Sequence, residues 1–419
     1  MRYLNIIPLI GGMTIGNMMA TGKKPEAIIS YSAFDKNDSH IVKYLKDVPY
    51  YVIDNMDSDS INELKEKYHG IDFVSGVPPC AGLSLLNSAN RSADAPQNEW
   101  MLKASEFILN NIEPKVFWCE NAPGLYSDLN ISFVNKLKEI GNKFNYTLSI
   151  YKTDTKYHGI PQLRPRTFFF FWKSNGVPKL NYYKRETPLF KDWMTPDKNE
   201  GPYKDVYITR KFPYEVSKEY IYLKEVFHNN NYIDLYNYCE ANSIKTTCGY
   251  LQKGIPNTST IEAYKNYIKW LDENGGDEKL SLGGNGERTF KTKAEYYLSK
   301  FKQNKGVFDI SPIFSYDYSS AMIGKNIHRQ LHPKEERFIS VQEGMKLMGL
   351  PEDFTFSMDV SKAWPHICQN VPTCTARDMT YEVIKFINNE LEIISSNFVK
   401  QNNLTEKIDY IEKTSVPLF

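Results

Sequence analysis

The feature that most constrains the fold of this chain is a repeated alternation of short apolar runs and helical patterns over residues 1–173. Such an alternation predicts successive strand–helix units, in which the strands pair in parallel and the helices cover both faces of the sheet. We therefore expect an α/β fold with a doubly wound, mostly parallel sheet, whose ligands bind at the carboxyl ends of the strands. The expected strands are Tyr3–Pro8, Ala27–Ser32, Tyr50–Ile53, Phe73–Ser75, Val116–Glu120, Thr147–Thr153 and Thr167–Trp172, and the expected helices include Trp100–Asn111 and Ile131–Phe144.

The pattern changes after residue 173. Residues 174–334 are rich in proline, tyrosine and mixed charges, and their periodicity is weak. We expect a second, smaller and irregular domain in this range. Helical patterning returns in residues 335–395, and residues 396–419 are expected to form a polar tail.

Composition bears on where the protein resides in the cell and on which kinds of binding site it can form. No apolar run reaches the ~20 residues that a membrane span needs, so no membrane association is expected. No small-residue cleavage site follows the apolar N-terminus, and we expect a cytoplasmic protein. The six cysteines contain no C-x-x-C pair, which argues against a zinc site or a disulfide framework. A net charge of +1 neither supports nor excludes a nucleic-acid partner.

A candidate nucleophile follows the fourth expected strand, in the segment Phe73-Val-Ser-Gly-Val-Pro-Pro-Cys-Ala-Gly-Leu-Ser84. The Gly/Pro-rich turn would expose the Cys80 thiol at the ligand edge of the sheet, where backbone N–H groups lower a thiol pKa. A thiolate in that position can attack an electron-poor carbon. Alternatively, Cys80 is a small buried hydrophobic residue, as most free cysteines are, and this segment alone favours neither interpretation.

A carboxyl group is expected at the same edge of the sheet. The segment Val116-Phe-Trp-Cys-Glu-Asn-Ala-Pro-Gly124 is a strand that ends in Glu120 and Asn121 at a turn. In a parallel sheet, Glu120 and Cys80 would emerge at the same edge and face a common cleft. Such a pair suits nucleophilic attack assisted by protonation of the substrate. In the alternative interpretation, Glu120 caps a helix and Asn121 fills a turn.

Two arginines enter the last expected strand, in Tyr157-His-Gly-Ile-Pro-Gln-Leu-Arg-Pro-Arg166. Arg164 and Arg166 are two residues apart, so their side chains point to the same side of an extended chain. Both guanidinium groups are therefore expected to reach one polar ligand. As isolated surface arginines they would indicate nothing.

In this order, the three segments resemble motifs of the C5-cytosine DNA methyltransferase family, which uses S-adenosylmethionine. Two C-terminal segments extend the resemblance: Arg329–Pro351 is similar to the ninth motif of the family, and Gln369–Arg377 to the tenth, which returns to pack on the cofactor. The resemblance covers residues 1–172 and 329–390. It implies a class I methyltransferase-like fold, with a catalytic and cofactor-binding domain at 1–173, a target-recognition domain at 174–334 and a segment at 335–395 that returns to the catalytic domain.

The resemblance also implies a reaction. A cytosine is flipped out of double-stranded DNA, and Cys80 adds to C6 of the ring to give a covalent intermediate in which C5 is nucleophilic. Glu120 would hold and protonate the ring at N3, while Arg164 and Arg166 would fix the base carbonyl and neighbouring groups. C5 then takes the methyl group, and no metal is required. The loop from Ser84 to Gln97 would close over the base, and the expected substrate contacts are Ser84, Gln97 and Asn121.

The cofactor end departs from the family pattern. The glycine-rich turn is Ile7-Pro-Leu-Ile-Gly-Gly-Met13, in which Ile7 replaces the usual aromatic residue and Leu9 the first glycine. Ala33 stands where the family has a ribose-binding Glu, and the lost hydrogen-bond acceptor would weaken binding by roughly 1–3 kcal/mol unless Asp35 replaces it. The cofactor contacts that the resemblance implies are Ile7, Gly11, Gly12, Phe34 (against the adenine), Asp35, Asp54 (near the adenine amino group), Pro79 and Asn370.

Three alternatives to DNA methylation stay open. One is a modified S-adenosylmethionine analogue as the donor of another C5 substituent, with His158 and Asn370 shaping its pocket. The second is a relative that binds DNA without catalysis, and the third is RNA methylation, against which the long segment 174–334 argues. The motifs specify neither a target sequence nor a cognate restriction enzyme. An enzyme is favoured by the joint presence of Cys80, Glu120, Arg164 and Arg166.

Overall fold

The computed structural model of the chain forms two compact units. One unit comprises Met1–Thr187 and Met345–Phe419, and the other comprises Pro188–Gly344. The second unit thus begins later than residue 174 and ends later than residue 334, the limits expected from composition, and its role in target recognition stays a prediction. The structure describes residues 1–34, 40–79, 81–83, 95–194, 218, 221–222, 225, 259–279, 289–305, 318–322, 330, 332–335, 338–356 and 360–412.

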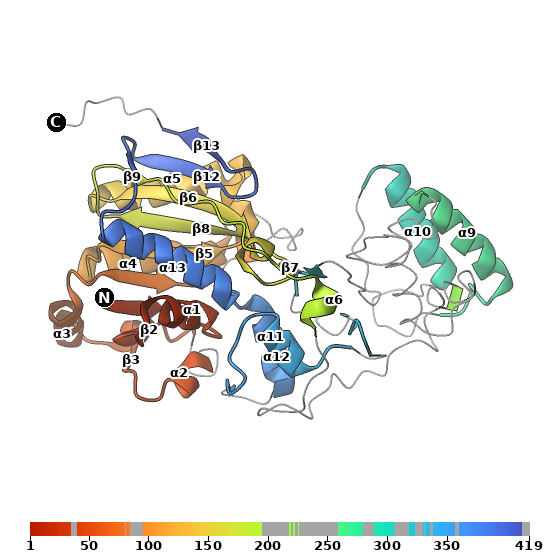
Figure 1. Cartoon of the computed structure of the whole chain (residues 1–419), viewed down its shortest axis with the longest axis horizontal. Helices are drawn as coiled ribbons and strands as arrows, with labels where there is room; N and C mark the ends of the chain where they lie inside the picture. The colour runs from red at the N-terminus through yellow and green to blue at the C-terminus, as the bar shows by residue number, and fades with distance from the viewer. Residues whose placement is uncertain are drawn as a thin grey trace. The chain divides into compact units, whose positions relative to one another are not determined.

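A nine-stranded sheet forms the centre of the first unit (Figure 1). β8 runs antiparallel to both of its neighbours, β13 runs antiparallel to β12, and the other five pairings are parallel. The expected doubly wound, mostly parallel sheet is therefore confirmed. β8 departs from the parallel pattern because its connection from β6 is too short for a crossover. In spatial order the strands are β13 (Lys407–Ile411), β12 (Phe398–Asn402), β6 (Thr147–Asp154), β8 (Pro165–Trp172), β5 (Val116–Asn121), β4 (Phe73–Gly76), β1 (Tyr3–Ile6), β2 (Ala27–Ser30) and β3 (Tyr50–Val52).

The described helices vary in length, and none is long and apolar enough to cross a membrane. They are α1 (Gly12–Thr21), α2 (His40–Tyr44), α3 (Ser58–Tyr68), α4 (Glu99–Asn111), α5 (Ile131–Lys143), α6 (Phe190–Trp193), α9 (Thr260–Glu273), α10 (Phe290–Lys302), α11 (Val341–Lys346), α12 (Val360–Gln369) and α13 (Thr373–Ile387). Short 3₁₀ turns that bear on the site are η3 (Pro96–Asn98), η4 (Pro123–Tyr126) and η6 (Thr155–His158), and the short strands are β7 (Gln162–Leu163), β9 (Val177–Pro178), β10 (Ser319–Ser320) and β11 (Ile393–Ile394).

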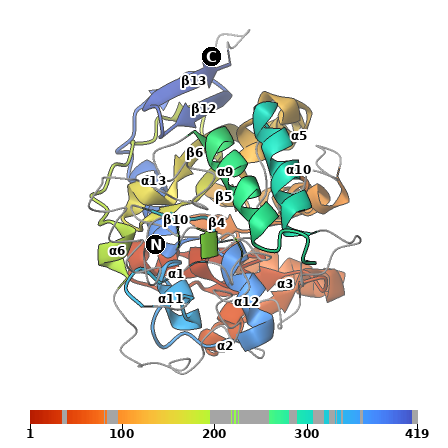
Figure 2. The same ribbon diagram turned by 90° about the vertical axis from the view of Figure 1, so that its right-hand side faces the viewer.

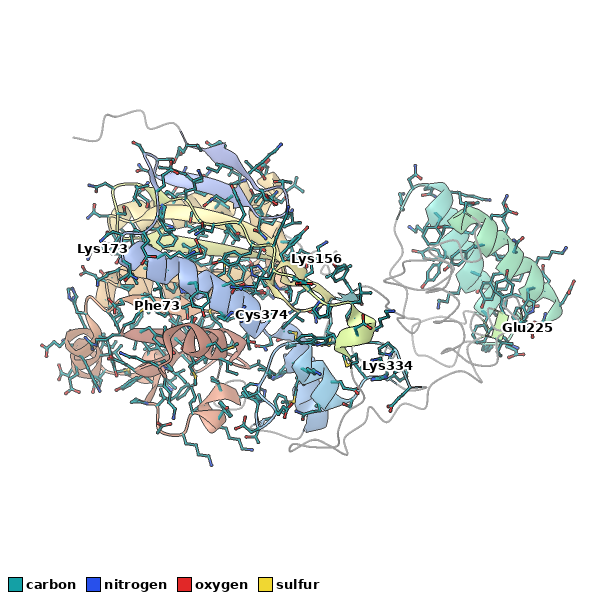
Figure 3. The ribbon with its side chains drawn as sticks, in the orientation of Figure 1. Phe73, Lys156, Lys173, Glu225, Lys334 and Cys374 are labelled. Carbon is teal, nitrogen blue, oxygen red and sulfur yellow. The ribbon has the colours of Figure 1, made fainter. Side chains whose placement is uncertain are left out.

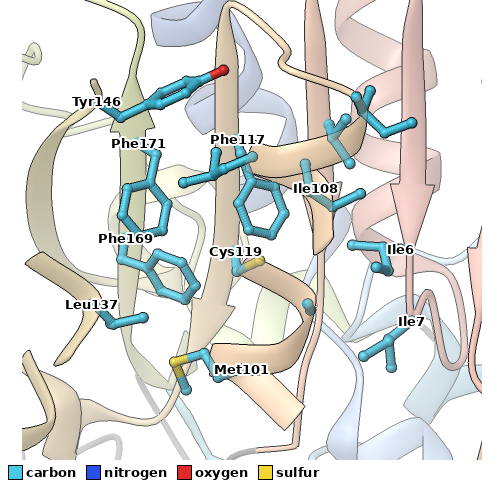
Figure 4. Packing of buried hydrophobic residues seen from close by; sticks show 14 of the residues in the cluster. Ile6, Ile7, Met101, Ile108, Phe117, Cys119, Leu137, Tyr146, Phe169 and Phe171 are labelled. Carbon is cyan, nitrogen blue, oxygen red and sulfur yellow. The ribbon is translucent and has the colours of Figure 1, made fainter. Parts of the chain in front are cut away.

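Helices cover both faces of the sheet because successive strand residues point to opposite faces. On one face, Phe117 and Phe169 pack with Met101 of α4 and with α5 (Figure 4). On the other face, Trp118 and Phe170 join the core that α1 and α13 cover. Both halves of the aromatic run in β8 are fully buried, as expected for a strand with a helix layer on each side.

Glycines allow α1 and α13 to approach closely. A Cβ on Gly12 would lie 2.0 Å from the carbonyl oxygen of Val371, and a Cβ on Gly16 would lie 2.5 Å from the Cβ of Ala376. Both distances are far shorter than van der Waals contact, so these two positions accept no side chain unless the helices separate.

Replacing Gly16 with alanine is therefore expected to destabilise the first unit by about 1–3 kcal/mol, even though alanine is the better helix former. Urea denaturation followed by circular dichroism measures the free energy of unfolding. Met19→Ala changes an exposed position of the same helix and serves as the control, with an expected change below about 0.5 kcal/mol. An equal loss in the two variants would contradict the close packing of α1 on α13.

The C-terminal residues belong to the sheet, and the predicted polar tail at 396–419 is wrong over β12 and β13, while 413–419 lie outside the described residues. β12 pairs in parallel with β6, and Phe398 is buried. Figure 2 shows β12 and β13 at one end of the sheet, next to β6. Polar residues in β12 misled the prediction because they have partners inside the fold: Gln401 exchanges hydrogen bonds of 3.0 and 3.2 Å with the backbone of Leu180.

Within the second unit, two described helices are regular where composition suggested an irregular domain. Ser259 caps the N-terminus of α9, and Thr289 and Thr292 form a capping box at α10. The helices pack through aromatic side chains, with the rings of Tyr264 and Phe301 centred 5.2 Å apart. The prediction from overall composition missed these helices, although the buried Tyr264, Tyr267 and Leu271 of α9 follow the helical spacing i, i+3, i+7.

Candidate active site

The carboxyl ends of β4 and β5 lie at one edge of the sheet, and Glu120 lies at the end of β5. The two strands are adjacent and parallel, and Gly76 pairs with Cys119. The chain therefore leaves both strands at the same edge of the sheet. The segments that follow stay close: a Cβ on Gly124 would lie 2.0 Å from the carbonyl oxygen of Leu83. Glycine at position 124 thus lets the turn after β5 touch the segment that follows β4.

Several predicted residues cannot be compared with this geometry, because the described residues exclude Asp35, Cys80 and Ser84. The closing loop predicted at 84–97 is described only from residue 95, and Gln97 is exposed in η3. Asn121 is fully buried, and its Oδ1 accepts the backbone N–H of Ala122 at 2.9 Å. This contact closes the turn after β5, in line with the turn-forming interpretation. The substrate contacts of these residues stay predictions.

Glu120 and Arg166 form an ion pair at this edge. Arg166 Nε donates to Glu120 Oε1, and Arg166 Nη1 donates to the carbonyl oxygen of Pro165 at 2.8 Å, which fixes the guanidinium plane. Glu120 is only 3% exposed. Burial raises the pKa of Glu120, and the nearby charges of Arg166 and Arg164 lower it in part, so that the net direction is upward. A buried carboxyl group that a cation orients can carry a proton at higher pH than an exposed glutamate.

Arg164 is fully buried and binds different partners. Its Nη2 donates to the carbonyl oxygens of Cys368 at 2.6 Å and Asn370 at 2.9 Å. These contacts involve no ligand, so the expectation that both guanidinium groups reach one ligand stays a prediction. Arg164 precedes β8, in the connection from β7, so the alternation of an extended strand does not apply to this pair of arginines. A direct catalytic role for Arg164 stays a prediction.

Replacing Arg164 with methionine is expected to lower the free energy of unfolding by about 2–4 kcal/mol, because two buried carbonyl oxygens lose a charged donor. Chemical denaturation measures the loss. Arg2→Met removes an arginine whose ion pair with Glu26 is largely exposed, and this control should cost less than about 1 kcal/mol. If the two variants were equally stable, the contacts of Arg164 would have no special weight.

The turn between β1 and α1 keeps left-handed backbone at three positions. The φ angle is +49° at Ile7 and at Leu9, and +107° at Gly11. A non-glycine residue in this region costs roughly 1–2 kcal/mol. Leu9 therefore adopts a backbone conformation that glycine would adopt without strain. The turn retains a glycine-type path although one glycine is missing.

Asn370 covers the N-terminus of α1. Its Oδ1 accepts the backbone N–H of Gly12 at 2.8 Å, and its side chain is buried. The Nδ2 of Asn370 has no hydrogen-bond partner among the described residues. A buried N–H group without a partner costs about 1–3 kcal/mol, which a carboxylate bound beside the turn would recover. These residues therefore fit a ligand that carries an acidic group.

Aromatic side chains form a second part of this region. The ring of Phe34 is half-buried and lies 5.1 Å, edge to face, from the ring of Trp100, which also lies 4.9 Å from that of Tyr31. Asp54 holds the turn that follows β2. Its exposed carboxylate accepts the backbone N–H of Ser32 at 2.7 Å and the Ser32 hydroxyl at 2.6 Å. Sequence reasoning missed Trp100, whose only signal was an aromatic residue in the first turn of a helix that follows a polar loop.

His158 has no free ring nitrogen for a donor pocket. It is 1% exposed, and its nitrogens lie 2.9 Å from Asp378 Oδ2 and 2.7 Å from Thr153 Oγ1. The structure thus gives no support to His158 as a residue that shapes the pocket of a modified donor. In the described part of the chain, no group of three or more His, Cys, Asp or Glu side chains is arranged to hold a metal ion.

One known protein family matches most of this chain. The profile of the family described as C-5 cytosine-specific DNA methylase matches residues 1–385. The chain belongs to this family. The resemblance drawn from the motifs is therefore confirmed, and the chain carries the Glu120–Arg166 pair where that resemblance predicts catalytic residues.

Individual relatives are more distant. The chain is 30% identical over 154 residues to the Type II methyltransferase M1.BsuMI of Bacillus subtilis (strain 168), and the match covers 35% of this chain and 34% of that relative. The alignment thus spans about a third of that relative's length. This chain is also 20% identical over 323 residues to the Type II methyltransferase M.Bpa9945I of Bacillus paralicheniformis, and that match covers 72% of this chain and 67% of the relative.

The chain shares its fold with the solved structure of a protein described as a DNA modification methyltransferase encoded within an E. coli prophage. The TM-score is 0.54 at 16% sequence identity, with 93% of this chain and 100% of the other chain covered. This likeness shows the fold. Membership of the family implies S-adenosylmethionine as the methyl donor. The described residues fit that cofactor, since Phe34 and Trp100 offer aromatic surface for an adenine and Asn370 offers a donor for a carboxylate.

Proposed function

We propose that the methylase transfers a methyl group from S-adenosylmethionine to C5 of a cytosine flipped out of double-stranded DNA. The observation that carries this proposal is the Glu120–Arg166 pair, buried at the sheet edge where β4 leads toward Cys80. An acid and a thiol that leave adjacent parallel strands suit addition to a ring carbon with protonation of the ring. The family to which the chain belongs supports the same reaction.

In the proposed reaction, the Cys80 thiolate forms a bond to C6, and electrons of the C5–C6 double bond shift toward N3. Glu120 gives its proton to N3, so the ring gains no net negative charge. Arg166 holds the Glu120 carboxyl group in place and stabilises the carboxylate that forms. When bound, the cofactor supplies an electrophilic methyl group on a sulfonium.

The last steps restore the ring. C5 forms a bond to the methyl group as the bond from that group to sulfur breaks, which leaves a neutral thioether. The C5 proton passes to a water molecule, and the electrons of that C–H bond rebuild the C5–C6 double bond as the bond from Cys80 to C6 breaks. The thiolate is regenerated, and Glu120 recovers the proton from N3. Arg164 acts here as a positioning residue, because its carbonyl partners Cys368 and Asn370 tie the arginine segment to the segment over the cofactor turn.

The test is incubation of the purified methylase with double-stranded DNA and S-adenosylmethionine, followed by mass spectrometry of the nucleosides. We expect 5-methylcytosine in DNA. A heavier substituent on cytosine, obtained only with a cell extract, would favour a modified donor. Retained DNA binding with unmodified cytosine would favour a non-catalytic relative, and modification of RNA alone would contradict the proposed substrate.

We also propose a role in restriction–modification, which the names of the two Type II methyltransferases support. Sequencing of modified cytosines in DNA from cells that express the chain would then reveal one short recognition sequence. Modification without a common sequence would contradict this role.

A further inference from the structure

A chain of buried hydrogen bonds lies between α13 and the end of β6. His158 Nδ1 is 2.9 Å from Asp378 Oδ2, and His158 Nε2 is 2.7 Å from Thr153 Oγ1. Asn403 Nδ2 donates to the same Thr153 oxygen at 3.0 Å. All four side chains are buried. They come from η6, α13, β6 and the turn after β12, so these hydrogen bonds join four separate segments.

The partners fix the direction of each hydrogen bond. Asp378 also accepts from Arg185 at 2.7 and 2.8 Å and from Arg377 at 3.0 Å. Burial opposes ionisation of Asp378, but the hydrogen bonds of His158 and Arg185 outweigh it and lower its pKa, while burial lowers the pKa of His158. A carboxylate faced only by donors requires the proton of neutral His158 on Nδ1. His158 Nε2 then accepts from the Thr153 hydroxyl.

Thr153 connects this chain to the candidate active site. In the antiparallel pairing of β6 with β8, Thr153 lies opposite Arg166, and Phe168 lies opposite Glu120 in the pairing of β8 with β5. Residues opposite one another share a face of the sheet, and so do residues two apart on one strand. Thr153, Arg166 and Glu120 therefore lie on the same face, the one that α13 covers.

A second acidic residue of α13 provides the comparison. Glu382, one turn after Asp378, accepts the Tyr183 hydroxyl at 2.6 Å and the backbone N–H of Asn181 at 2.8 Å. Its other described partner is Lys385, so none of its described hydrogen bonds reaches η6. Figure 3 shows the side chains of α13, which begins beside the labelled Cys374, against the sheet of the first unit. Asp378 and Glu382 thus lie on the same helix, but among the described hydrogen bonds only those of Asp378 reach His158.

We propose that Asp378 and His158 are positioning residues for the methylation reaction: they hold the end of β6 and, through its pairing with β8, the orientation in which Arg166 presents Glu120 to the base. This inference rests on the proposed function. In Asp378→Asn, the amide would bring a donor where three donors already converge. This clash of donors is relieved only if His158 changes tautomer. Its Nε2 then becomes a donor toward Thr153 and disturbs that residue, which lies opposite Arg166 in the pairing of β6 with β8.

The experiment compares Asp378→Asn with Glu382→Gln by single-turnover methylation at saturating DNA and cofactor. We expect Asp378→Asn to slow methyl transfer by about 10- to 100-fold, the scale of a small misalignment of catalytic groups. The dissociation constant for DNA should stay unchanged. Glu382→Gln should leave both quantities unchanged, since its described hydrogen bonds run to Asn181, Tyr183 and Lys385 and not to His158 or Thr153.

A second readout does not depend on activity. The ¹⁵N-labelled protein should show a side-chain Nε–H resonance of Arg166, hydrogen-bonded to Glu120, that moves in Asp378→Asn and not in Glu382→Gln. An unmoved resonance together with an unchanged rate would overturn the inference. Equal losses in both variants would also overturn it, because α13 would then stabilise the fold without positioning the site.

The outcomes also separate the inference from the proposed function. If the wild-type protein transfers no methyl group, the proposed function fails, while the Arg166 resonance still decides whether Asp378 orients the pair. If Asp378→Asn does not fold, Thr153→Val removes the hydrogen bond between β6 and His158 and leaves the ion pairs of Asp378 intact. The same shift of the Arg166 resonance is then expected, and its absence would refute the inference.

Discussion

Replacing Cys80 with alanine is expected to abolish methyl transfer to DNA, with a loss on the order of 10⁴-fold or more in the single-turnover rate. The proposed route depends on a covalent bond to C6, and no neighbouring hydroxyl is as nucleophilic as a thiolate. DNA that contains 5-fluorocytosine gives a direct measurement. Fluorine cannot leave C5 as a proton does, so the wild-type protein should stay bound to the DNA on a denaturing gel, and Cys80→Ala should not.

The cysteines that the structure describes supply a matched control. Cys119, Cys368 and Cys374 are free and buried, and burial raises the pKa of each thiol. Protonated thiols are poor nucleophiles, so none of the three should replace Cys80. Cys374→Ala should therefore form the adduct with 5-fluorocytosine as the wild-type protein does. A trapped complex with Cys80→Ala, or its loss in Cys374→Ala, would contradict the assignment of the nucleophile.

The strands of the first unit could be predicted from sequence because most are buried on both faces. Such strands consist of short continuous apolar runs, and the run at Val116–Glu120 extends in the structure by one residue, to Asn121. The position of Glu120 at the ligand edge followed from the same rule, since parallel strands end together. β12 was missed for the opposite reason: its polar residues are satisfied by partners that lie far away in the sequence.

The contacts that organise the site could not be predicted in this way. His158 and Asp378 are 220 residues apart, and no local pattern links them. The two arginines form a further example, because their spacing does not reveal their protein partners. Arg164 donates to carbonyl groups near the N-terminus of α13, whereas Arg166 pairs with Glu120. Motifs thus identified which residue types gather at the edge, and long-range packing decided what each one binds.

Replacing Glu120 with glutamine is expected to slow methyl transfer by about 10²–10⁴-fold, the usual contribution of a general acid. Glutamine keeps an oxygen that can accept from Arg166, so the orientation of the pair should survive while the transferable proton is lost. The rate at saturating DNA measures the effect. Glu106→Gln on α4, which alters an exposed ion pair with Lys143 of α5, is the control and should leave the rate unchanged.

The dependence on pH tests the same assignment. Because burial raises the pKa of Glu120 by more than Arg166 and Arg164 lower it, the protonated form persists above the pH at which an exposed glutamate ionises. The wild-type rate should fall as pH rises through this raised pKa, and the rate of Glu120→Gln should not. Stability has the same sign: the native state binds the proton more tightly than the unfolded chain, so the stabilisation is complete below the ordinary pKa and is lost as pH rises through the raised one. Glu120→Gln should remove that slope from the free energy of unfolding, and a variant that kept the wild-type profile in both measurements would show that another group supplies the proton.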